Sequence, residues 1–200
     1  TGRAAALTAL ADSQLYVVHV TCAEAVARIA EARGKGLRVF GETCPQYLVL
    51  DESYLEKPDF EGAKYVWSPP LRTKDHQEAL WNALKSGQLQ AVGSDMCSFD
   101  FKGQKELGRG DFSKIPNGGP TIEDRFSILY SEGVAKGRIT LNRFVDLVST
   151  QAAKLFGLFP RKGTIAPGSD ADLVLFDPNV RRTISAANHH MAVDYNAFEG

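Results

Sequence analysis

Two side chains of this chain have the chemistry to bind a metal ion or to move a proton, and each is associated with an apolar run. The first is His19, toward the end of the apolar run 15–20. A run without alternation is typical of a strand that is covered on both faces, as in a parallel sheet. A neutral imidazole at the end of such a strand suits zinc. Position alone predicts equally well a core histidine that is hydrogen-bonded to the backbone.

The second candidate is Asp95, which follows the apolar run 89–93 and the small residue Ser94. Its carboxylate could bind a metal, accept a proton from a metal-activated water, or do both in turn. An isolated aspartate at the start of a loop is more often a turn or helix cap. Since the carboxyl ends of parallel strands open into one mouth, His19 and Asp95 together indicate a metal site. That site is incomplete, because a catalytic metal usually needs at least three protein ligands.

Two proline-containing loops could hold a small ligand through their backbone groups. The serine loop (residues 67–72) contains Ser68 followed by two prolines, which restrict the backbone and can hold the groups of Ser68 toward a ligand. The Pro-Asn-Gly loop (residues 114–120) contains Asn117, which could offer backbone or amide groups to an imide-like ring. Taken without other information, the first loop is better explained as a rigid turn and the second as an Asn-Gly turn.

Strands and helices are expected to alternate along most of the chain, which is typical of parallel βα units and predicts an α/β fold. Three such units cannot close a barrel, so either the chain is incomplete or the remaining strands lie elsewhere. A separate short strand is expected in the turn-rich tail, over residues 173–176. The other expected strands are 15–20, 37–41 and 89–93, and the expected helices are 4–11, 24–33, 75–85, 122–136, 141–148 and 152–158, with long loops over 43–73 and 97–120.

The composition excludes several classes of function. Hydrophobic residues make up 44% and charged residues 24% of the 200 residues, as in an ordinary globular protein, and the net charge is -1. This charge leaves no electrostatic footprint for nucleic acid or an anionic membrane, and no apolar run approaches the length of a membrane span. Cys22, Cys44 and Cys97 are few, odd in number and far apart, which fits reduced thiols in a cytoplasmic protein.

Several motifs occur here in the order found in D-hydantoinases and dihydropyrimidinases, which belong to the amidohydrolase superfamily. The segment 162–173 is typical of the superfamily, and the serine loop together with the Pro-Asn-Gly loop is typical of its hydantoinase branch. The chain resembles this family from about Leu15 to its end. The other matching motifs are Val17-Val18-His19-Val20, Gly41-Glu42-Thr43-Cys44-Pro45 and Gly93-Ser94-Asp95.

This resemblance implies a fold in two parts. Residues 1–160 would be the C-terminal part of a metal-dependent (β/α)8 TIM barrel, about its last three βα units. Residues 161–200 would be a segment of a small C-terminal β-sandwich domain and the start of the C-terminal tail. The family's other metal ligands lie N-terminal to anything present here, and the chain starts at Thr1 without an initiator Met. We therefore expect a partial sequence of a complete enzyme, and no catalysis by this segment alone.

The resemblance also implies a site and a reaction. The family uses two divalent metal ions, usually zinc, bridged by a carboxylated lysine that is not present in this segment. His19 matches a histidine metal ligand, and Asp95 matches the aspartate that binds a metal and serves as general base and acid. Ser68 and Asn117 match the residues whose backbone groups hold the substrate. The implied activity is hydrolytic ring opening of hydantoins and dihydropyrimidines to N-carbamoyl amino acids, in a cytoplasmic homo-oligomer (a tetramer or a dimer) without nucleic-acid or membrane partners.

Two other functions stay open. One is a non-catalytic dihydropyrimidinase-related scaffold protein; such relatives tend to lose metal ligands, whereas His19 and Asp95 are both present. The other is a different ring-opening amidohydrolase, an allantoinase or a dihydroorotase, for which the serine loop and the Pro-Asn-Gly loop are a weaker match. We therefore expect an active cyclic amidohydrolase.

Overall fold

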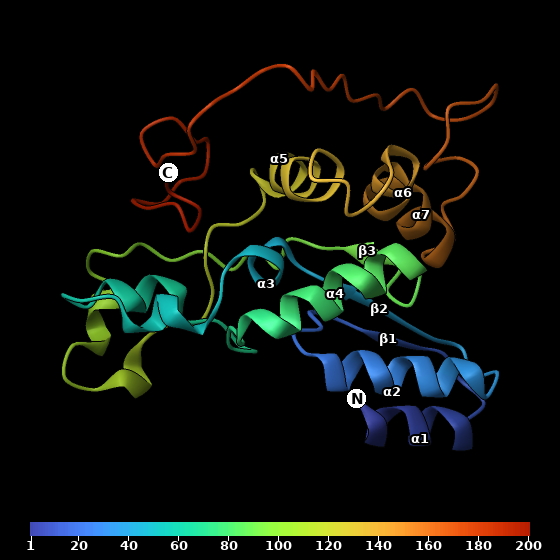
Figure 1. The fold of residues 1–200 in the computed structure, drawn as a ribbon, viewed down its shortest axis with the longest axis horizontal. Coiled ribbons are helices and arrows are strands. Elements are labelled where there is room, and N and C mark those ends of the chain that lie inside the picture. Colours follow the sequence, from blue (N-terminus) through green and yellow to red (C-terminus); the bar gives the residue numbers. More distant parts are fainter.

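The computed structural model describes residues 1–200 and has a three-stranded parallel sheet at its centre. Strand β1 (Leu15–Val17) pairs with β2 (Val39–Thr43), and β2 pairs with β3 (Ala91–Val92), so the strand order follows the sequence. Helices separate the strands along the chain, as Figure 1 shows. The parallel pairing confirms the α/β class that the alternation of strands and helices predicts.

The middle strand β2 lies about two residues later than expected. Its residues alternate between buried and half-buried, with Val39, Gly41 and Thr43 buried and Glu42 half-buried. The apolar pattern ends where Glu42 begins, but pairing with β3 continues to Thr43, which lies opposite Val92. The strand therefore includes a charged residue that a run of apolar residues does not indicate.

Helix α2 (Ala23–Gly34) packs on β2, on helix α1 (Gly2–Leu10) and on helix α4 (Lys74–Ser86). Its buried residues Val26 and Ile29 are three positions apart, which places them on one face. Glu24 in the first turn is favourable at the positive end of the helix dipole. The expected helix is thus confirmed, with its apolar face directed toward the sheet.

Helix α4 (Lys74–Ser86) follows the same logic. Leu80 and Leu84, one turn apart, are buried as expected. The helix ends at Gly87, whose φ of 80° is in the left-handed region that favours glycine at a helix C-terminus. In Figure 1, α4 crosses the molecule between α2 and the later helices.

The two long loops contain short helical segments that the sequence patterns do not show. Two of these segments are initiated by an aspartate: Asp51 accepts a hydrogen bond from the Ser53 N–H, and Asp111 accepts one from the Ser113 N–H. Such local bonds form a turn without any hydrophobic periodicity. The segments are α3 (Pro45–Val49) and 3₁₀ turns over Glu52–Glu56, Glu61–Tyr65, Lys105–Gly108 and Phe112–Lys114.

The expected C-terminal helices are present and include stretches of π-helix. Helix α5 (Arg125–Ile128) continues as a π-helix over Leu129–Val134. A second helical run is continuous, so the two helices expected over 141–148 and 152–158 join. It consists of α6 (Leu141–Val145), a π-helix over Asp146–Thr150, and α7 (Gln151–Leu155).

None of the helices has both the length and the hydropathy to span a membrane.

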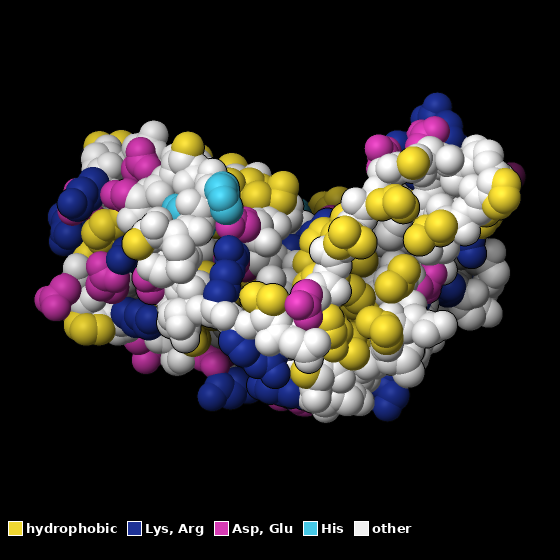
Figure 2. Space-filling model, turned by 90° about the horizontal axis from the view of Figure 1, so that it is seen from above, with side chains coloured by type: hydrophobic (Ala, Val, Ile, Leu, Met, Phe, Trp, Pro, Cys, Tyr) yellow, Lys and Arg dark blue, Asp and Glu magenta, His cyan; other side chains and the backbone are white.

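The strand expected over residues 173–176 is wrong for this chain. No strand forms in residues 161–200, which include an arch that passes over α5, α6 and α7 (Figure 1). Leu173, Val174 and Leu175 are 63%, 72% and 99% exposed, and Figure 2 shows hydrophobic side chains gathered on the face that carries the arch. A strand requires a neighbouring backbone for its hydrogen bonds, and this chain places none beside the segment.

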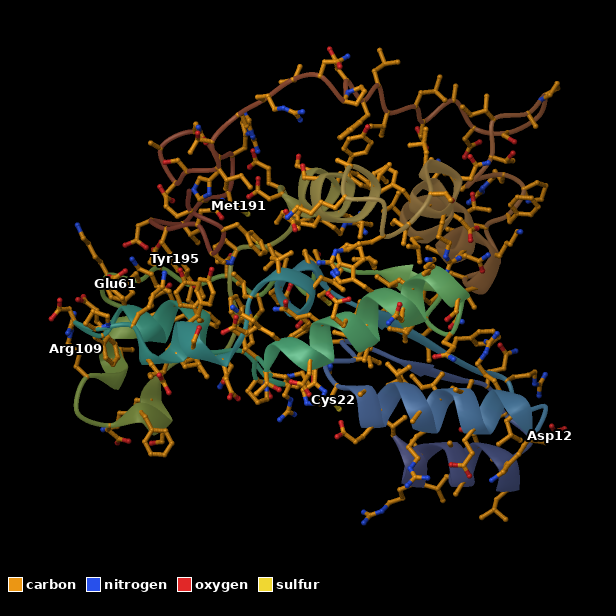
Figure 3. All side chains as sticks on the ribbon, viewed as in Figure 1. Asp12, Cys22, Glu61, Arg109, Met191 and Tyr195 are labelled. Atoms are coloured by element: carbon orange, nitrogen blue, oxygen red, sulfur yellow. The ribbon has the colours of Figure 1, made fainter.

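The end of the chain returns to the body of the molecule. Tyr195 and Asn196 are buried. The Tyr195 hydroxyl donates to the Lys64 carbonyl at 3.3 Å, beside the turn that carries Glu61 (Figure 3). Asn196 Nδ2 donates to Asp124 Oδ2 at 2.8 Å. These contacts anchor the tail independently of the arch.

The main core lies between the sheet and helices α2 and α4. Ile29, Val39, Leu80, Leu84 and Leu89 have no exposed surface. Close packing of this kind leaves little space for relaxation when a side chain is shortened. The core therefore holds the strands at fixed positions relative to the helices.

We expect Leu84→Ala to lower the free energy of unfolding of the full-length protein by about 2–5 kcal/mol, since it removes buried methyl groups and leaves a cavity. The neighbouring Lys85→Ala changes an exposed residue of the same helix and should stay within about 0.5 kcal/mol of the wild type. Urea denaturation followed by circular dichroism measures both. Similar values for the two variants would contradict this description of the core.

Candidate metal and substrate site

His19 and Asp95 lie at the same edge of the sheet, just beyond the carboxyl ends of β1 and β3. Both have a positive φ, 40° for His19 and 51° for Asp95. Non-glycine residues adopt this region uncommonly, although aspartate and histidine are enriched in it; Asp12, Asp59 and Phe60 also have a positive φ in this chain. The structure thus brings the two predicted metal ligands to one edge and holds both in uncommon backbone conformations.

Glu42 of β2 lies between these two residues, and the sequence patterns assigned it no role. The Tyr16 hydroxyl donates to Glu42 Oε2 at 2.8 Å. Burial raises the pKa of Glu42, and the hydrogen bond from Tyr16 opposes this shift. The charge of Asp95 raises the pKa of Glu42 further, whereas His19 and Arg125 lower it. Both predicted ligands therefore influence the pKa of Glu42, which indicates that the three side chains lie near one another.

Two hydrogen bonds hold the turn that carries Asp95. Arg125 Nη1 donates to the Val92 carbonyl at 2.6 Å, at the end of β3. Thr121 Oγ1 donates to the Ser94 carbonyl, also at 2.6 Å. Both donors come from the segment that follows the Pro-Asn-Gly loop. The position of Asp95 is therefore fixed by residues far along the chain.

The serine loop and the Pro-Asn-Gly loop lie against each other. The Gly118 N–H donates to the carbonyl of Val66, the residue before the serine loop, at 2.9 Å. Trp67 is buried, and its ring is so close to Gly119 that a Cβ there would lie 2.8 Å from Cζ2. The two loops consequently form one packed unit, and a side chain at position 119 would separate them.

The two predicted substrate residues occupy the outside of this unit. Ser68 and Asn117 are both exposed. The backbone groups of Ser68 and Asn117 make no backbone hydrogen bond within the chain. These groups are therefore free to bind a polar ligand, as both loops were expected to do.

Further contacts connect the loop pair to the strand ends. Arg72, at the end of the serine loop, donates through Nε to Thr21 Oγ1 at 3.3 Å, just beyond β1. Gly118 lies against Cys97, just beyond β3, and a Cβ at Gly118 would be 2.1 Å from the Cys97 carbonyl oxygen. All four predicted site residues therefore belong to one connected region of the structure.

The donors at the strand ends fit part of a zinc site. The imidazole of His19 and the carboxylate of Asp95 are nitrogen and oxygen ligands of the kind that zinc binds. No group of three or more His, Cys, Asp or Glu side chains in the chain is arranged to hold a metal ion. The chain thus contributes two suitable donors at this edge rather than a full set.

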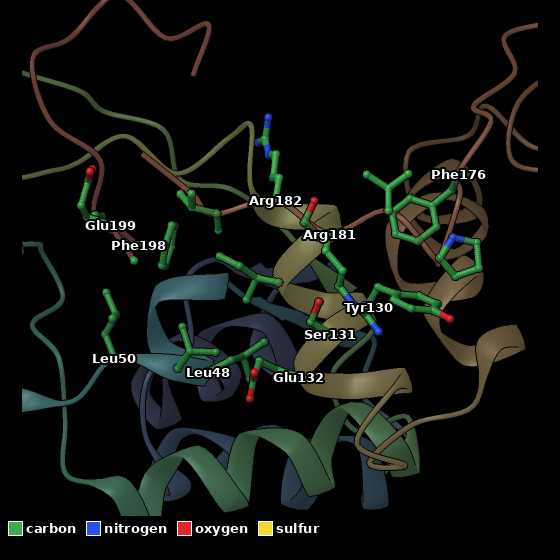
Figure 4. Close-up of a pocket in the computed structure, with 18 of the residues that line it drawn as sticks. Leu48, Leu50, Tyr130, Ser131, Glu132, Phe176, Arg181, Arg182, Phe198 and Glu199 are labelled. Atoms are coloured by element: carbon green, nitrogen blue, oxygen red, sulfur yellow. The ribbon is translucent and has the colours of Figure 1, made fainter. Parts of the chain in front are cut away.

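A cavity of about 810 Å³ lies elsewhere, between the helical run 125–134 and the part of the arch formed by residues 175–184 (Figure 4). Its lining includes Leu48, Tyr130, Phe176 and Phe198, and none of the four predicted site residues. The cavity lacks a converging set of imidazole and carboxylate groups. We therefore place the candidate site at the strand ends and not in this cavity.

Parallel βα units with an imidazole and a carboxylate beyond their carboxyl ends are the arrangement of a metal-dependent barrel hydrolase. The sequence model of the Amidohydrolase family matches residues 5–200. The chain therefore belongs to the amidohydrolase family.

Within this family the chain is similar over its whole length to D-hydantoinases. It is 80% identical over 200 residues to the D-hydantoinase of Geobacillus stearothermophilus. The aligned region covers 100% of this chain and 42% of that protein. A crystal structure of a dihydropyrimidinase from Brevibacillus agri NCHU1002 has a TM-score of 0.98 and 75% identity, with 100% of this chain and 43% of that chain covered. A crystal structure of a D-hydantoinase has the same TM-score and coverage, with 81% identity.

These matches also show how much of its relatives' length the chain spans. It spans about two fifths of the length of its relatives, since it covers 42% of the curated D-hydantoinase and 43% of each solved chain. The three-stranded parallel sheet is consistent with part of a hydantoinase barrel. The expected family is confirmed, whereas the roles of the individual site residues stay predictions.

Gly93 offers a test of the packing at the strand ends. A Cβ at Gly93 would lie 2.8 Å from both carboxylate oxygens of Glu42. Because the Tyr16 hydroxyl holds this carboxylate, we expect Gly93→Ala to lower the free energy of unfolding by about 1–3 kcal/mol. Gly34→Ala is the matched control, because nothing lies within 4 Å of its added Cβ. Chemical denaturation of the full-length variants measures the difference, and equal effects would show that Glu42 does not fill this space.

Proposed function

We propose that this chain is part of an enzyme that opens cyclic amides, hydantoins and dihydropyrimidines, by hydrolysis to N-carbamoyl amino acids. The observation that carries the proposal is the 80% identity to a D-hydantoinase across all 200 residues. The match to a solved dihydropyrimidinase also covers 100% of this chain, with a TM-score of 0.98. The two names together support both ring classes as substrates.

His19 and Asp95 are the residues of this chain that would hold metal. We assign them to a centre of two divalent ions, with zinc as the metal, because imidazole and carboxylate donors both suit it. When bound, such ions supply a hydroxide nucleophile at neutral pH. Their shared position beyond the carboxyl ends of β1 and β3 supports their role as ligands, since the sites of barrel enzymes form at that face.

Asp95 would transfer the proton. Its carboxylate would accept the proton of the hydroxide as the hydroxide oxygen bonds to the ring carbonyl carbon. It then returns the proton to the ring nitrogen as the carbon–nitrogen bond breaks. One water is consumed, and the nitrogen leaves as part of the carbamoyl group. The fixed turn around Asp95, held through the Ser94 carbonyl, would keep the carboxylate in position for both transfers.

Ser68 and Asn117 would bind the ring. A cyclic amide presents N–H donors and carbonyl acceptors, so it requires both kinds of partner. The free backbone N–H and carbonyl groups of these two exposed residues provide both. Because the two loops form one packed unit, their binding groups would be held at fixed positions relative to each other.

The proposal extends to organisation. We assign residues 1–160 to the barrel and residues 161–200 to a small β domain and the start of the tail. The exposed apolar side chains of segment 173–176 support this division, since apolar groups of this kind are usually covered in a complete protein. We also propose a homo-oligomer, a tetramer or a dimer. The three unbridged cysteines support a cytoplasmic location.

Asp95→Asn is expected to reduce the turnover of the full-length enzyme by about 10²- to 10⁴-fold, because the amide cannot accept the proton. Asp12→Asn is the matched control, since Asp12 also has a positive φ, of 44°, and its side chain is fully exposed on the surface, at 103%. Ring opening of hydantoin and dihydrouracil measures turnover. Near-normal activity of Asp95→Asn would remove this residue from the proton transfer.

His19→Asn should lower the bound metal, since it removes the imidazole and keeps a residue type that tolerates a positive φ. His190→Asn, at a histidine whose side chain is 89% exposed, should retain the wild-type metal content. Metal analysis of the purified full-length proteins decides whether His19 is a metal ligand or a core histidine. Unchanged metal in His19→Asn would make His19 a core histidine, and a metal-free, inactive wild type would support the scaffold alternative.

A further inference from the structure

Lys105 is a fully buried lysine that neither the sequence patterns nor the proposed mechanism uses. It begins the 3₁₀ turn Lys105–Gly108 in the long loop after β3, and it is 0% exposed. Lysine is almost never fully buried unless its charge is compensated. The contacts of its ammonium group therefore need an explanation.

Three backbone carbonyls accept hydrogen bonds from the Lys105 ammonium group. Nζ donates to the Gly118 carbonyl at 2.7 Å, to the Pro116 carbonyl at 2.8 Å and to the Val66 carbonyl at 3.3 Å. Two of these carbonyls flank Asn117, and the third directly precedes the serine loop. The side chain thus lies beneath both predicted substrate loops and joins them.

The contact of Lys105 with Pro116 fixes the direction of the Asn117 N–H, and the hydrogen bond between the two loops fixes the direction of the Asn117 carbonyl. In a trans peptide the carbonyl and the following N–H point in opposite directions, and the Pro116–Asn117 bond is not among the cis bonds of the chain. Because the Pro116 carbonyl faces Lys105, the Asn117 N–H faces away from it. Likewise the Gly118 N–H faces the Val66 carbonyl, so the Asn117 carbonyl points away from Val66.

The charge of Lys105 strengthens this arrangement. Burial lowers the pKa of Lys105 to about 8, so the ammonium form predominates at neutral pH. A charged donor makes stronger hydrogen bonds than a neutral one, above all in a buried site. Its partners are carbonyl oxygens and not carboxylates, so the stabilisation is directed entirely at the backbone of the two loops.

We propose that Lys105 is a positioning residue for substrate binding: it ties the serine loop to the Pro-Asn-Gly loop and aims the backbone groups of Asn117 at the ring. This inference rests on the proposed function, because it assumes that Asn117 binds the substrate. Lys105 itself does not touch the substrate. It acts through the two loops that do.

Lys105→Met in the full-length enzyme tests the proposal, since it keeps an unbranched side chain and removes every donor. We expect KM for hydantoin to rise about tenfold and kcat/KM to fall by up to about 100-fold, as expected when a bound group is misplaced by about 1 Å. Bound metal should be unchanged. Hydrogen–deuterium exchange should become faster in peptides that cover residues 66–72 and 114–120.

Two further variants complete the design. Lys102→Met makes the same change at an exposed lysine of the same loop, and its KM and exchange rates should equal those of the wild type. Lys105→Gln returns two N–H donors without the charge, and its KM should lie between the values for Lys105→Met and the wild type. Lys105→Gln also decides the outcome if Lys105→Met does not fold.

Unchanged KM and unchanged exchange in both loops, even with a lower melting temperature, would overturn the proposal and leave Lys105 a purely structural residue. The same result in a folded Lys105→Gln would overturn it if Lys105→Met does not fold. An inactive wild type would contradict the proposed function instead. In that case the exchange rates would still show whether Lys105 orders the two loops.

Discussion

Parallel pairing of β1, β2 and β3 is the constraint on which the rest of the structure depends. Strands that run in the same direction end at the same edge of a sheet, so the residues that follow them meet there. His19 and Asp95 are 76 positions apart in the sequence by their numbers, and Glu42 comes from the strand between them. Only the pairing of the strands gives these three residues a common environment. The helices α2 and α4 contribute by holding the strands in place through a fully buried core.

The candidate site departs repeatedly from what local stability favours. His19 and Asp95 have left-handed backbones, Glu42 is a half-buried carboxylate, and Lys105 is a buried ammonium. The two buried charged groups have specific partners: the Tyr16 hydroxyl for Glu42 and backbone carbonyls for Lys105. Proteins retain such local conflicts mainly where function requires them. Three of these four residues, His19, Glu42 and Asp95, belong to the strand ends, and Lys105 contacts the two loops beside them.

Local patterns in the sequence were sufficient for much of this description. The spacing of Leu80 and Leu84 predicts α4 and its buried face, because the helical period is a property of neighbouring residues. The apolar runs predict the strands, and their alternation with helices predicts parallel pairing. His19 and Asp95 could be identified as strand-end residues for the same reason. Ser68 and Asn117 depended on the family resemblance, since a proline-rich turn has the same local appearance with or without a ligand.

The sequence by itself therefore determined the class of fold and the two apolar runs after which the site residues lie, although β1 and β3 end earlier than those runs. The tertiary structure alone decided the limits of β2, the place of Glu42 and the contacts of Lys105. It also showed that the apolar segment 173–176 is unpaired. The physical reason is the same in each case. A strand limit, a buried charge and a paired edge all depend on partners far along the chain, and periodicity within a segment carries no information about such partners.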